Sequence, residues 1–256
     1  MAFIHLDHLP ETTKVQSPLN IIIPDPGSMK GIPIKERKVL YLLHGLSDDG
    51  SAWQRYTSIE TYARTYGLVV VMPSFGRSFY LDQPNGQQYF TYLTDELPQY
   101  LKDVFGIIPD REKTFIAGLS MGGYGAIKAA FLHPKSYFAA ASFSGVLSFE
   151  MLAAHSDDPH KAEFELLFGD VRQLPGSKHD PAVWLKQARE KQLDLPRLYI
   201  SCGLQDELLP MSRQFTSACQ SLGVPVEYHE ETGIHDWYFW DKQIQEFLAF
   251  SLENDK

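Results

Sequence analysis

Cysteine is scarce in this chain, whose 256 residues include only Cys202 and Cys219. Two cysteines are too few for the disulfide framework that small secreted domains use to compensate for a small core. One lies in an expected core strand and the other in an expected helix, so we predict that both are buried free thiols.

Long apolar runs are also missing. No stretch approaches the roughly 20 apolar residues that a membrane-spanning helix needs. The segment from Met1 to His8 lacks the basic region and the apolar core of a secretion signal. The sequence therefore predicts a cytoplasmic protein with no membrane partner.

Positive charge is in the minority: 23 Lys and Arg residues against 32 Asp and Glu residues give a formal net charge of −9. The basic residues do not cluster, so we expect no nucleic-acid partner, because phosphate binding needs a basic patch. The glycine-rich stretch 118–125 lacks the Lys-Ser/Thr pair of a phosphate-binding loop. The polar run 155–160 lacks the ligand spacing of known metal sites and is typical of a loop. We therefore expect neither a cofactor nor a metal.

A serine within a glycine-rich turn is the most informative feature that is present. Gly118, Ser120 and Gly122 fit the G-x-S-x-G pattern, in which a sharp strand-to-helix turn lifts a nucleophilic hydroxyl above a sheet. The apolar run 114–117 precedes the pattern, and a helical stretch up to Pro134 follows it. A serine at a helix N-terminus can also be a simple N-cap, so the pattern needs a base and an acid.

Both partners follow in the order that this kind of site requires, which is Ser, then Asp or Glu, then His. Asp206 comes just after the apolar strand pattern 197–202, and His235 follows a second strand pattern at 226–230. Ser120, Asp206 and His235 are the predicted catalytic triad. Glu207 is the main alternative to Asp206. His44 is a weaker alternative to His235, because a base at that position would break the chain order.

The chemistry explains why these residue types are needed. A serine hydroxyl is a weak nucleophile until an imidazole takes its proton, and a carboxylate holds that imidazole in the right orientation. Attack on an ester creates an oxyanion that backbone N–H groups stabilise, by about 2.7–4 kcal/mol for one donor. We expect one donor at Met121, which follows the nucleophile, and another at Leu46, in the loop after the strand pattern 38–43.

Short apolar segments alternate with helical ones along the chain. This rhythm predicts a mostly parallel central sheet with helices on both faces in a single α/β domain over residues 1–256. The expected strands cover 15–23, 38–43, 68–72, 114–117, 139–143, 197–202 and 226–230. The expected helices cover 58–66, 92–105, 121–132, 161–168, 181–187, 211–222 and 237–252. The segment from about 146 to 192 breaks the rhythm and is either a small cap insertion or a plain surface excursion.

Aromatic side chains near the expected site could line a substrate pocket. Phe75, Phe79 and Tyr80 follow the strand at 68–72, and Trp237 comes two residues after His235. We predict that these four residues bind substrate, although most aromatic residues fill cores.

Four sequence blocks together carry a family resemblance: residues 42–46, 118–123, 203–206 and 233–237. The four blocks, taken in this order along the chain, resemble the putative-esterase branch of the α/β hydrolases. That branch includes small tributyrin esterases, S-formylglutathione hydrolases, feruloyl esterases and mycolyltransferases. The resemblance extends from about Lys38 to the C-terminal helix and is greatest to the compact tributyrin esterases. It implies the α/β-hydrolase fold, the triad and amides named above, and a homo-oligomer.

The expected function is a serine carboxylesterase that hydrolyses short-chain acyl esters of aryl, glyceride or sugar alcohols through an acyl-enzyme. One alternative is a thioesterase of the S-formylglutathione hydrolase type. Those enzymes usually carry a Ser-Gly-Leu-Thr-Cys-Thr-like run where this chain has residues 44–49. A non-catalytic binding protein is the other alternative. The physiological ester and its acyl length are not encoded in any motif.

Overall fold

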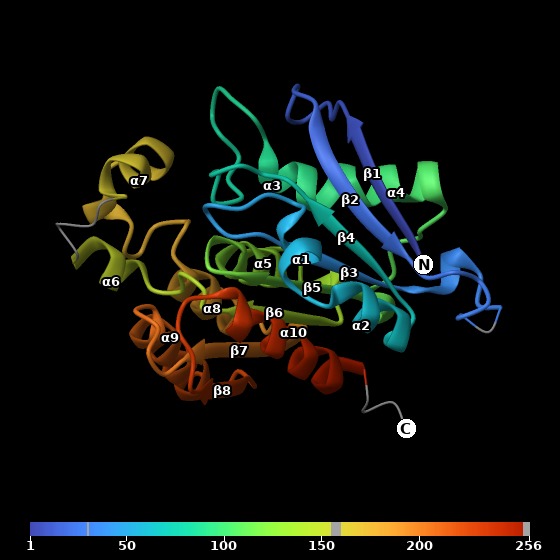
Figure 1. Ribbon diagram of the computed structural model, residues 1–256. Coiled ribbons are helices and arrows are strands. Elements are labelled where there is room, and N and C mark those ends of the chain that lie inside the picture. Colours follow the sequence, from blue (N-terminus) through green and yellow to red (C-terminus); the bar gives the residue numbers. More distant parts are fainter. Residues whose placement is uncertain (30, 155–159, 253–256) are drawn as a thin grey trace.

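The structure, a computed structural model, describes residues 1–29, 31–154 and 160–252. One eight-stranded sheet with the strand order β1-β2-β4-β3-β5-β6-β7-β8 forms its centre (Figure 1). The strands are β1 (Ala2–His8), β2 (Ser17–Ile23), β3 (Lys38–Leu43), β4 (Leu68–Pro73), β5 (Thr114–Leu119), β6 (Ala139–Phe143), β7 (Arg197–Gly203) and β8 (Glu227–Glu231). Strands β3 to β8 run parallel, whereas β2 is antiparallel to both of its neighbours.

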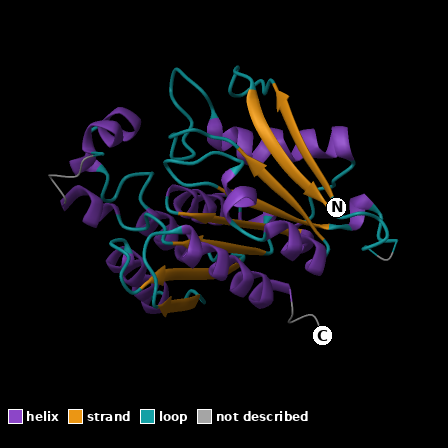
Figure 2. Ribbon diagram, in the orientation of Figure 1, coloured by secondary structure: helices purple, strands orange, loops and turns teal. Residues whose placement is uncertain are grey.

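Helices cover both faces of this sheet (Figure 2). This arrangement confirms the fold class predicted from the alternating segments. The α-helices are α1 (Ala52–Tyr56), α2 (Ile59–Tyr66), α3 (Tyr89–Thr91), α4 (Leu97–Phe105), α5 (Met121–Leu132), α6 (Phe149–Ala154), α7 (Lys161–Phe168), α8 (Pro181–Glu190), α9 (Leu209–Ser221) and α10 (Trp237–Leu252). A π-helical turn, Tyr92–Glu96, joins α3 to α4.

Alternate residues of the central strands enter two apolar layers. Val39, Tyr41 and Leu43 of β3 pack with α4, α5, α8 and α9 on one face. Leu40 and Leu42 pack with α1, α2 and α10 on the other face. Strands buried on both faces are near-continuous in apolar residues, which is why β3 to β6 were predictable. The register aligns Leu43 with Gly118 and Gly118 with Ser142, so the strands end together at one edge.

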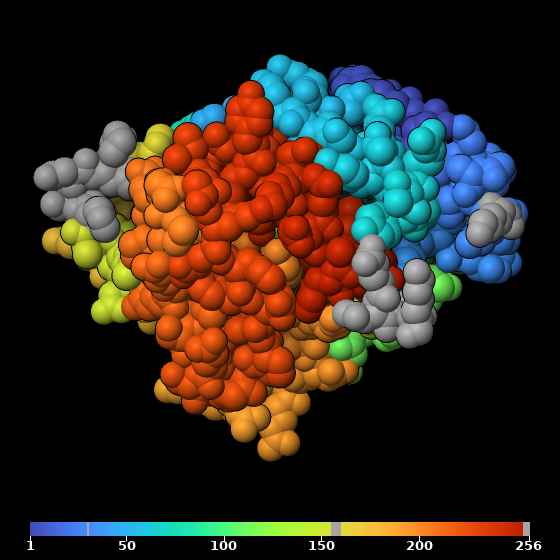
Figure 3. Space-filling view, turned by 60° about the horizontal axis from the view of Figure 1, so that its bottom comes forward, coloured from blue at the N-terminus to red at the C-terminus, as the bar shows by residue number. Residues whose placement is uncertain are grey.

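The C-terminal helix lies beside the segment of α1 and α2, although about 180 residues separate them in sequence. Figure 3 shows the C-terminal region in red next to light-blue residues of the early chain. Asp241 of α10 accepts hydrogen bonds from the Ser58 amide and from the Tyr62 hydroxyl. The contact fixes the start of α10, which directly follows the loop of His235.

The insertion between β6 and β7 has two parts. Helices α6 and α7 project at one end of the molecule (Figure 1); we call these two the cap helices. Helix α8 instead packs against α5 in the layer that covers the sheet. The part standing away from the body is therefore shorter than the predicted segment 146–192, of which residues 155–159 lie outside the described residues.

Strand β1 was not predicted, because its exposed and half-buried residues alternate without a strong apolar signal. The helices α1 and α6 were also missed, since each is only five or six residues long. Within the described residues, the longest apolar helices fall short of what crossing a membrane requires.

Candidate active site

Ser120 occupies a strained turn between β5 and α5. Its φ of 52° is rare for a residue other than glycine, and its amide donates to the Phe143 carbonyl at 2.9 Å. A Cβ atom at position 122 would lie 2.4 Å from the Leu43 carbonyl oxygen, and one at position 118 would lie 2.3 Å from the Gly122 oxygen. The glycines of the sequence pattern are therefore needed because three chain segments meet closely beneath the serine.

His235 and Asp206 form a hydrogen-bonded pair. Nδ1 of His235 lies 2.9 Å from Oδ2 of Asp206, whose side chain is completely buried. The Leu208 amide donates to the other carboxylate oxygen at 2.8 Å. Burial by itself would raise the pKa of Asp206, but the hydrogen bond and charge of His235, the Leu208 amide and the Ser144 hydroxyl together lower it. The carboxylate thus stays charged beside the imidazole.

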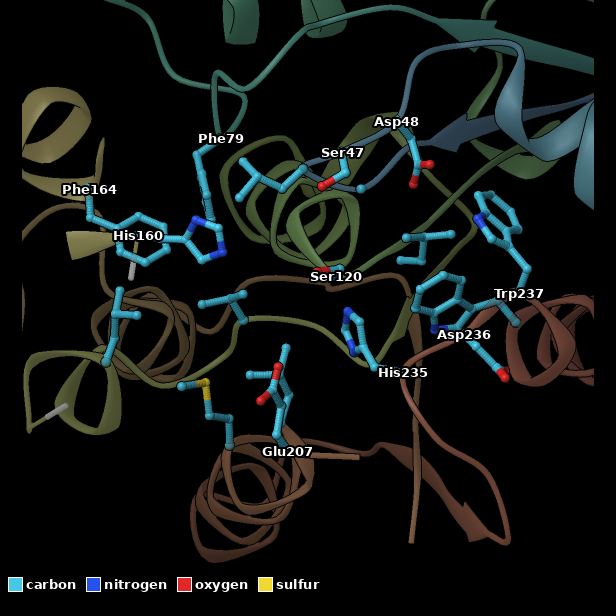
Figure 4. Close-up of a pocket in the computed structure, with 18 of the residues that line it drawn as sticks. Ser47, Asp48, Phe79, Ser120, His160, Phe164, Glu207, His235, Asp236 and Trp237 are labelled. Carbon is cyan, nitrogen blue, oxygen red and sulfur yellow. The ribbon is translucent and has the colours of Figure 1, made fainter. Parts of the chain in front are cut away.

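Ser120 and His235 line the same cavity, which has a volume of about 930 Å³. Figure 4 shows both side chains near its centre. No hydrogen bond joins their side chains in the part of the chain that is described. Such contacts are often loose in free enzymes and tighten when substrate binds. Each residue of the predicted triad follows the end of a parallel strand, so the sheet places all three at one edge.

The two predicted amide donors flank this serine. Met121 is the first residue of α5, so its N–H is one of those that a helix leaves without an internal partner. Leu46 lies in the loop after β3 and lines the cavity next to Gly45 and Ser47. Met121 therefore follows Ser120 at the helix start and Leu46 lies in the cavity wall, and their role as oxyanion donors stays a prediction.

His44 supports the loop of Leu46 and does not face the cavity. Its Nε2 accepts a hydrogen bond from the Phe75 amide at 2.9 Å, so the proton is on Nδ1, which donates to the Gly45 carbonyl at 2.8 Å. Burial lowers the pKa of His44, and the ring stays neutral. With both nitrogens engaged, His44 cannot serve as the base.

The other acidic and histidine side chains near the triad in sequence do not take its roles. The Asp236 carboxylate accepts from the Phe239 amide at 3.0 Å and thus caps α10. His229 lies 2.9 Å from Glu227 on β8. Glu207 is exposed at the cavity rim, and the carboxylate bonded to His235 is that of Asp206.

The four aromatic residues predicted to bind substrate fall into two groups. Phe79 and Trp237 line the cavity, whereas Phe75 and Tyr80 are completely buried beneath it and are absent from its wall. The Tyr80 hydroxyl donates to the His44 carbonyl at 2.8 Å, and its ring fills the space that Gly125 leaves. Phe75 and Tyr80 are therefore core residues that support the loops of the site.

Trp240 is a cavity residue that was not predicted from the sequence. Trp240 contacts the ring of His235 edge-on, with centroids 4.9 Å apart, and its Nε1 donates to Ser144. Trp237 contacts both Trp240 and the buried Trp53. The spacing of Trp237 and Trp240 after His235 was the available signal, because residues on the first turn of a helix lie near the preceding loop.

The lining of the cavity differs between the two sides of Ser120, which we call the cap-side arm and the tryptophan-side arm (Figure 4). The cap-side arm is mostly apolar: it is lined by Phe79, Val146, Leu152, Phe164 and Met211, together with the imidazole of His160. The tryptophan-side arm is more polar and is lined by Asp48, Asp236, Trp237 and Trp240. Burial raises the pKa of Asp48, and the neighbouring Asp49 acts in the same direction. The described residues contain no cluster of three or more His, Cys, Asp or Glu side chains suited to a metal ion.

Comparisons with known proteins agree with this geometry. The sequence profile of the putative esterase family matches residues 14–250. An acetyl esterase of Caldicellulosiruptor saccharolyticus is 32% identical over 92% of this chain and 91% of its own length.

Two solved structures are similarly close. A fluorophosphonate-binding serine hydrolase of Staphylococcus aureus, solved with substrate bound, superposes with a TM-score of 0.89 at 32% identity. An S-formylglutathione hydrolase of the same organism gives 0.87 at 32% identity, and each alignment covers 98% of both chains. The chain has the α/β-hydrolase fold, belongs to the putative esterase family and is a serine carboxylic ester hydrolase.

Proposed function

We propose that Ser120, His235 and Asp206 hydrolyse short-chain carboxylic esters through an acyl-enzyme. The observation that carries the proposal is the buried Asp206–His235 pair, which shares one cavity with a serine held at a strained backbone angle. Because Nδ1 of His235 is bonded to Asp206, Nε2 is the nitrogen left to exchange a proton with Ser120.

The reaction proceeds in two stages. Ser120 Oγ attacks the carbonyl carbon while its proton passes to His235, and the amides of Leu46 and Met121 hold the oxyanion. Collapse of this intermediate breaks the bond to the alcohol oxygen, which takes the proton from His235. Water then attacks the acyl-enzyme with the same base, and the carboxylic acid leaves as Ser120 regains its proton.

The two arms of the cavity suggest how an ester is oriented. The mostly apolar cap-side arm suits a short acyl chain, because Phe79 and Phe164 offer hydrocarbon surface there. The tryptophan-side arm suits an aryl, glyceride or sugar alcohol, since Trp237 and the carboxylate of Asp48 both line it.

A thioesterase of the S-formylglutathione type is the second candidate, and the similarity to the Staphylococcus aureus S-formylglutathione hydrolase favours it. The acidic lining favours an ester instead. Asp48 and Glu207 line the cavity, and their carboxylates would repel the carboxylates of a glutathione group.

A substrate panel with a nucleophile variant tests the proposal. We expect wild-type enzyme to hydrolyse p-nitrophenyl acetate and tributyrin faster than S-formylglutathione, and a fluorophosphonate probe to label Ser120. Ser120→Ala should fold normally, escape labelling and lose activity by roughly 10⁴–10⁶-fold. A strong preference for the thioester would reverse the order of the two candidates, and an unlabelled, inactive wild type would contradict both.

The cytoplasmic location, the homo-oligomer and the closer likeness to tributyrin esterases remain predictions. Gel filtration and sedimentation measure the oligomeric state directly, and an assay with tributyrin tests the likeness to tributyrin esterases.

A further inference from the structure

Arg77 connects two parts of the active site that are otherwise separate in the chain. It lies in the loop after β4, and its Nη1 donates to the Leu46 carbonyl at 3.2 Å. Its Nε and Nη2 donate to the two carboxylate oxygens of Glu163, each at 2.5 Å. Glu163 belongs to the cap helix α7. One guanidinium therefore contacts both the loop of a proposed oxyanion donor and the cap.

Glu163 lies directly beside a residue of the cavity wall. Phe164 is 5% exposed, lines the cap-side arm and packs edge-on against Phe79, with ring centroids 5.2 Å apart. The loop of Arg77 also carries Phe79, at a φ of 49°. The ion pair and the ring contact thus join the same two segments, one on either side of the arm.

At its C-terminal end α7 is held by Phe168, whose ring packs against Phe79 and Tyr124, whereas near its start the ion pair of Glu163 is the polar contact with the β4 loop. Leu166 on this helix is 84% exposed, and the helix is only eight residues long. A bidentate pair between a guanidinium and a carboxylate restrains distance and orientation together. The two groups also shift each other's pKa: the hydrogen bonds of the pair lower the pKa of Glu163 and raise that of Arg77.

We propose that Arg77 is a positioning residue that holds α7 against the cap-side arm and thereby limits the length of the acyl chain that the enzyme accepts. This inference rests on the proposed esterase function. The contact with the Leu46 carbonyl gives Arg77 a second effect, since it orients the residue whose amide faces the oxyanion. The two effects are separable, because Glu163 takes part only in the first.

The decisive comparison is between Glu163→Ala and Glu165→Ala. Alanine favours a helix, so each variant removes one negative charge from α7 without disfavouring helix formation. Residues two apart on a helix point in different directions, and Glu165 is exposed. The measured quantity is kcat/KM for p-nitrophenyl octanoate divided by that for p-nitrophenyl acetate.

We expect Glu163→Ala to raise this ratio by about three- to fivefold, which is the upper part of the range for one exposed ion pair. The change should come from a lower KM for the octanoate, with kcat for the acetate unaltered. Glu165→Ala should keep the wild-type ratio. Equal ratios in the two variants, or a shift only when the alcohol is changed, would overturn the inference.

Two further variants separate the roles of Arg77. Arg77→Gln loses both contacts, so it should raise the ratio and also lower kcat for every acyl length. The exchange Arg77→Glu with Glu163→Arg restores opposite charges but not the donor to Leu46. It should bring the ratio back toward wild type while kcat stays low, and failure to recover the ratio would count against the ion pair.

The outcome for the parent enzyme distinguishes this inference from the proposed function. A wild type that hydrolyses no ester contradicts the function itself. An active wild type whose chain-length profile is insensitive to Glu163 contradicts only the role of Arg77.

Discussion

Asp206 is the residue whose environment most directly affects the chemistry. A buried carboxylate would ordinarily tend to protonate, and a neutral acid could not hold His235 in the tautomer that the reaction needs. The hydrogen bonds from His235 and Leu208 keep its pKa below the ordinary value in spite of burial. The neighbouring Glu207 has no such surroundings, since it is exposed at the cavity rim.

Exchange of these two acids for their amides should therefore give opposite results. Asp206→Asn should reduce kcat by on the order of 10⁴-fold, because the amide stabilises the wrong tautomer of His235. Glu207→Gln should remain within about threefold of wild type, as expected for an exposed charge that makes no hydrogen bond to the base. Steady-state kinetics with p-nitrophenyl acetate measures both. An active Asp206→Asn enzyme would move the orienting role to Glu207.

Among the elements, α5 combines two requirements. Its first turn must approach β3 closely, which Gly122 permits, and its later turns are buried among other helices. Lys128 is nevertheless in this buried part. Its Nζ donates to the Tyr80 carbonyl at 2.8 Å and lies 4.0 Å from the centroid of the Phe90 ring. Burial lowers the pKa of Lys128 to about 7; Asp82 opposes this shift and Lys178 adds to it.

Because of this buried lysine, the free energy of unfolding should vary with pH in the alkaline range. The folded-state pKa lies below that of an unfolded lysine, so the unfolded chain binds more protons between about pH 7 and pH 10.4. Stability due to this group should rise with pH across that window and stay constant below it. The difference in unfolding free energy between wild type and Lys128→Met should grow by at most about 1.4 kcal/mol per pH unit.

Urea denaturation of both proteins at pH 7, 8 and 9 measures this difference. Taking the difference cancels the tyrosines and cysteines that also titrate at alkaline pH. A difference that does not change with pH would show that Lys128 keeps an ordinary pKa.

For the whole molecule, the sequence predicted β3 to β7 because burial on both faces leaves a strong apolar signal, whereas the half-exposed β8 was predicted from its alternating pattern. Strand β1 gives no such signal, since its half-exposed side chains alternate. The triad positions followed from chain order, since parallel strands end at one edge. Phe75 and Tyr80 were assigned wrongly because an aromatic residue in a loop near a site can point inward or outward, and only packing decides which.

The link between the cap and the body could not be predicted either. Arg77 and Glu163 are 86 residues apart, and nothing in the local pattern of either residue indicates the other. The same holds for the contact between Asp241 and Tyr62. Such long-range polar pairs depend on how finished elements pack, whereas motifs depend on neighbours in sequence.

The two cysteines should report on global unfolding. Cys202 lies in β7 and Cys219 in α9, and both are completely buried. Neither thiol is therefore open to solvent. Because burial also raises the pKa of each thiol to about 12, neither is ionised at neutral pH. We expect no reaction with Ellman's reagent in the native protein and two reactive thiols after denaturation in guanidinium chloride. Rapid reaction of the native protein would contradict the buried placement.

The aromatic cluster behind the catalytic histidine has an optical consequence. Three of the four tryptophans, Trp53, Trp237 and Trp240, form a chain of indole rings that runs from the core to the cavity wall. The emission of this chain should change in wavelength and intensity whenever an acyl group or an inhibitor displaces water beside it. The tryptophan fluorescence of the unlabelled enzyme should therefore report whether the cavity is occupied, so that acylation and deacylation could be followed in real time.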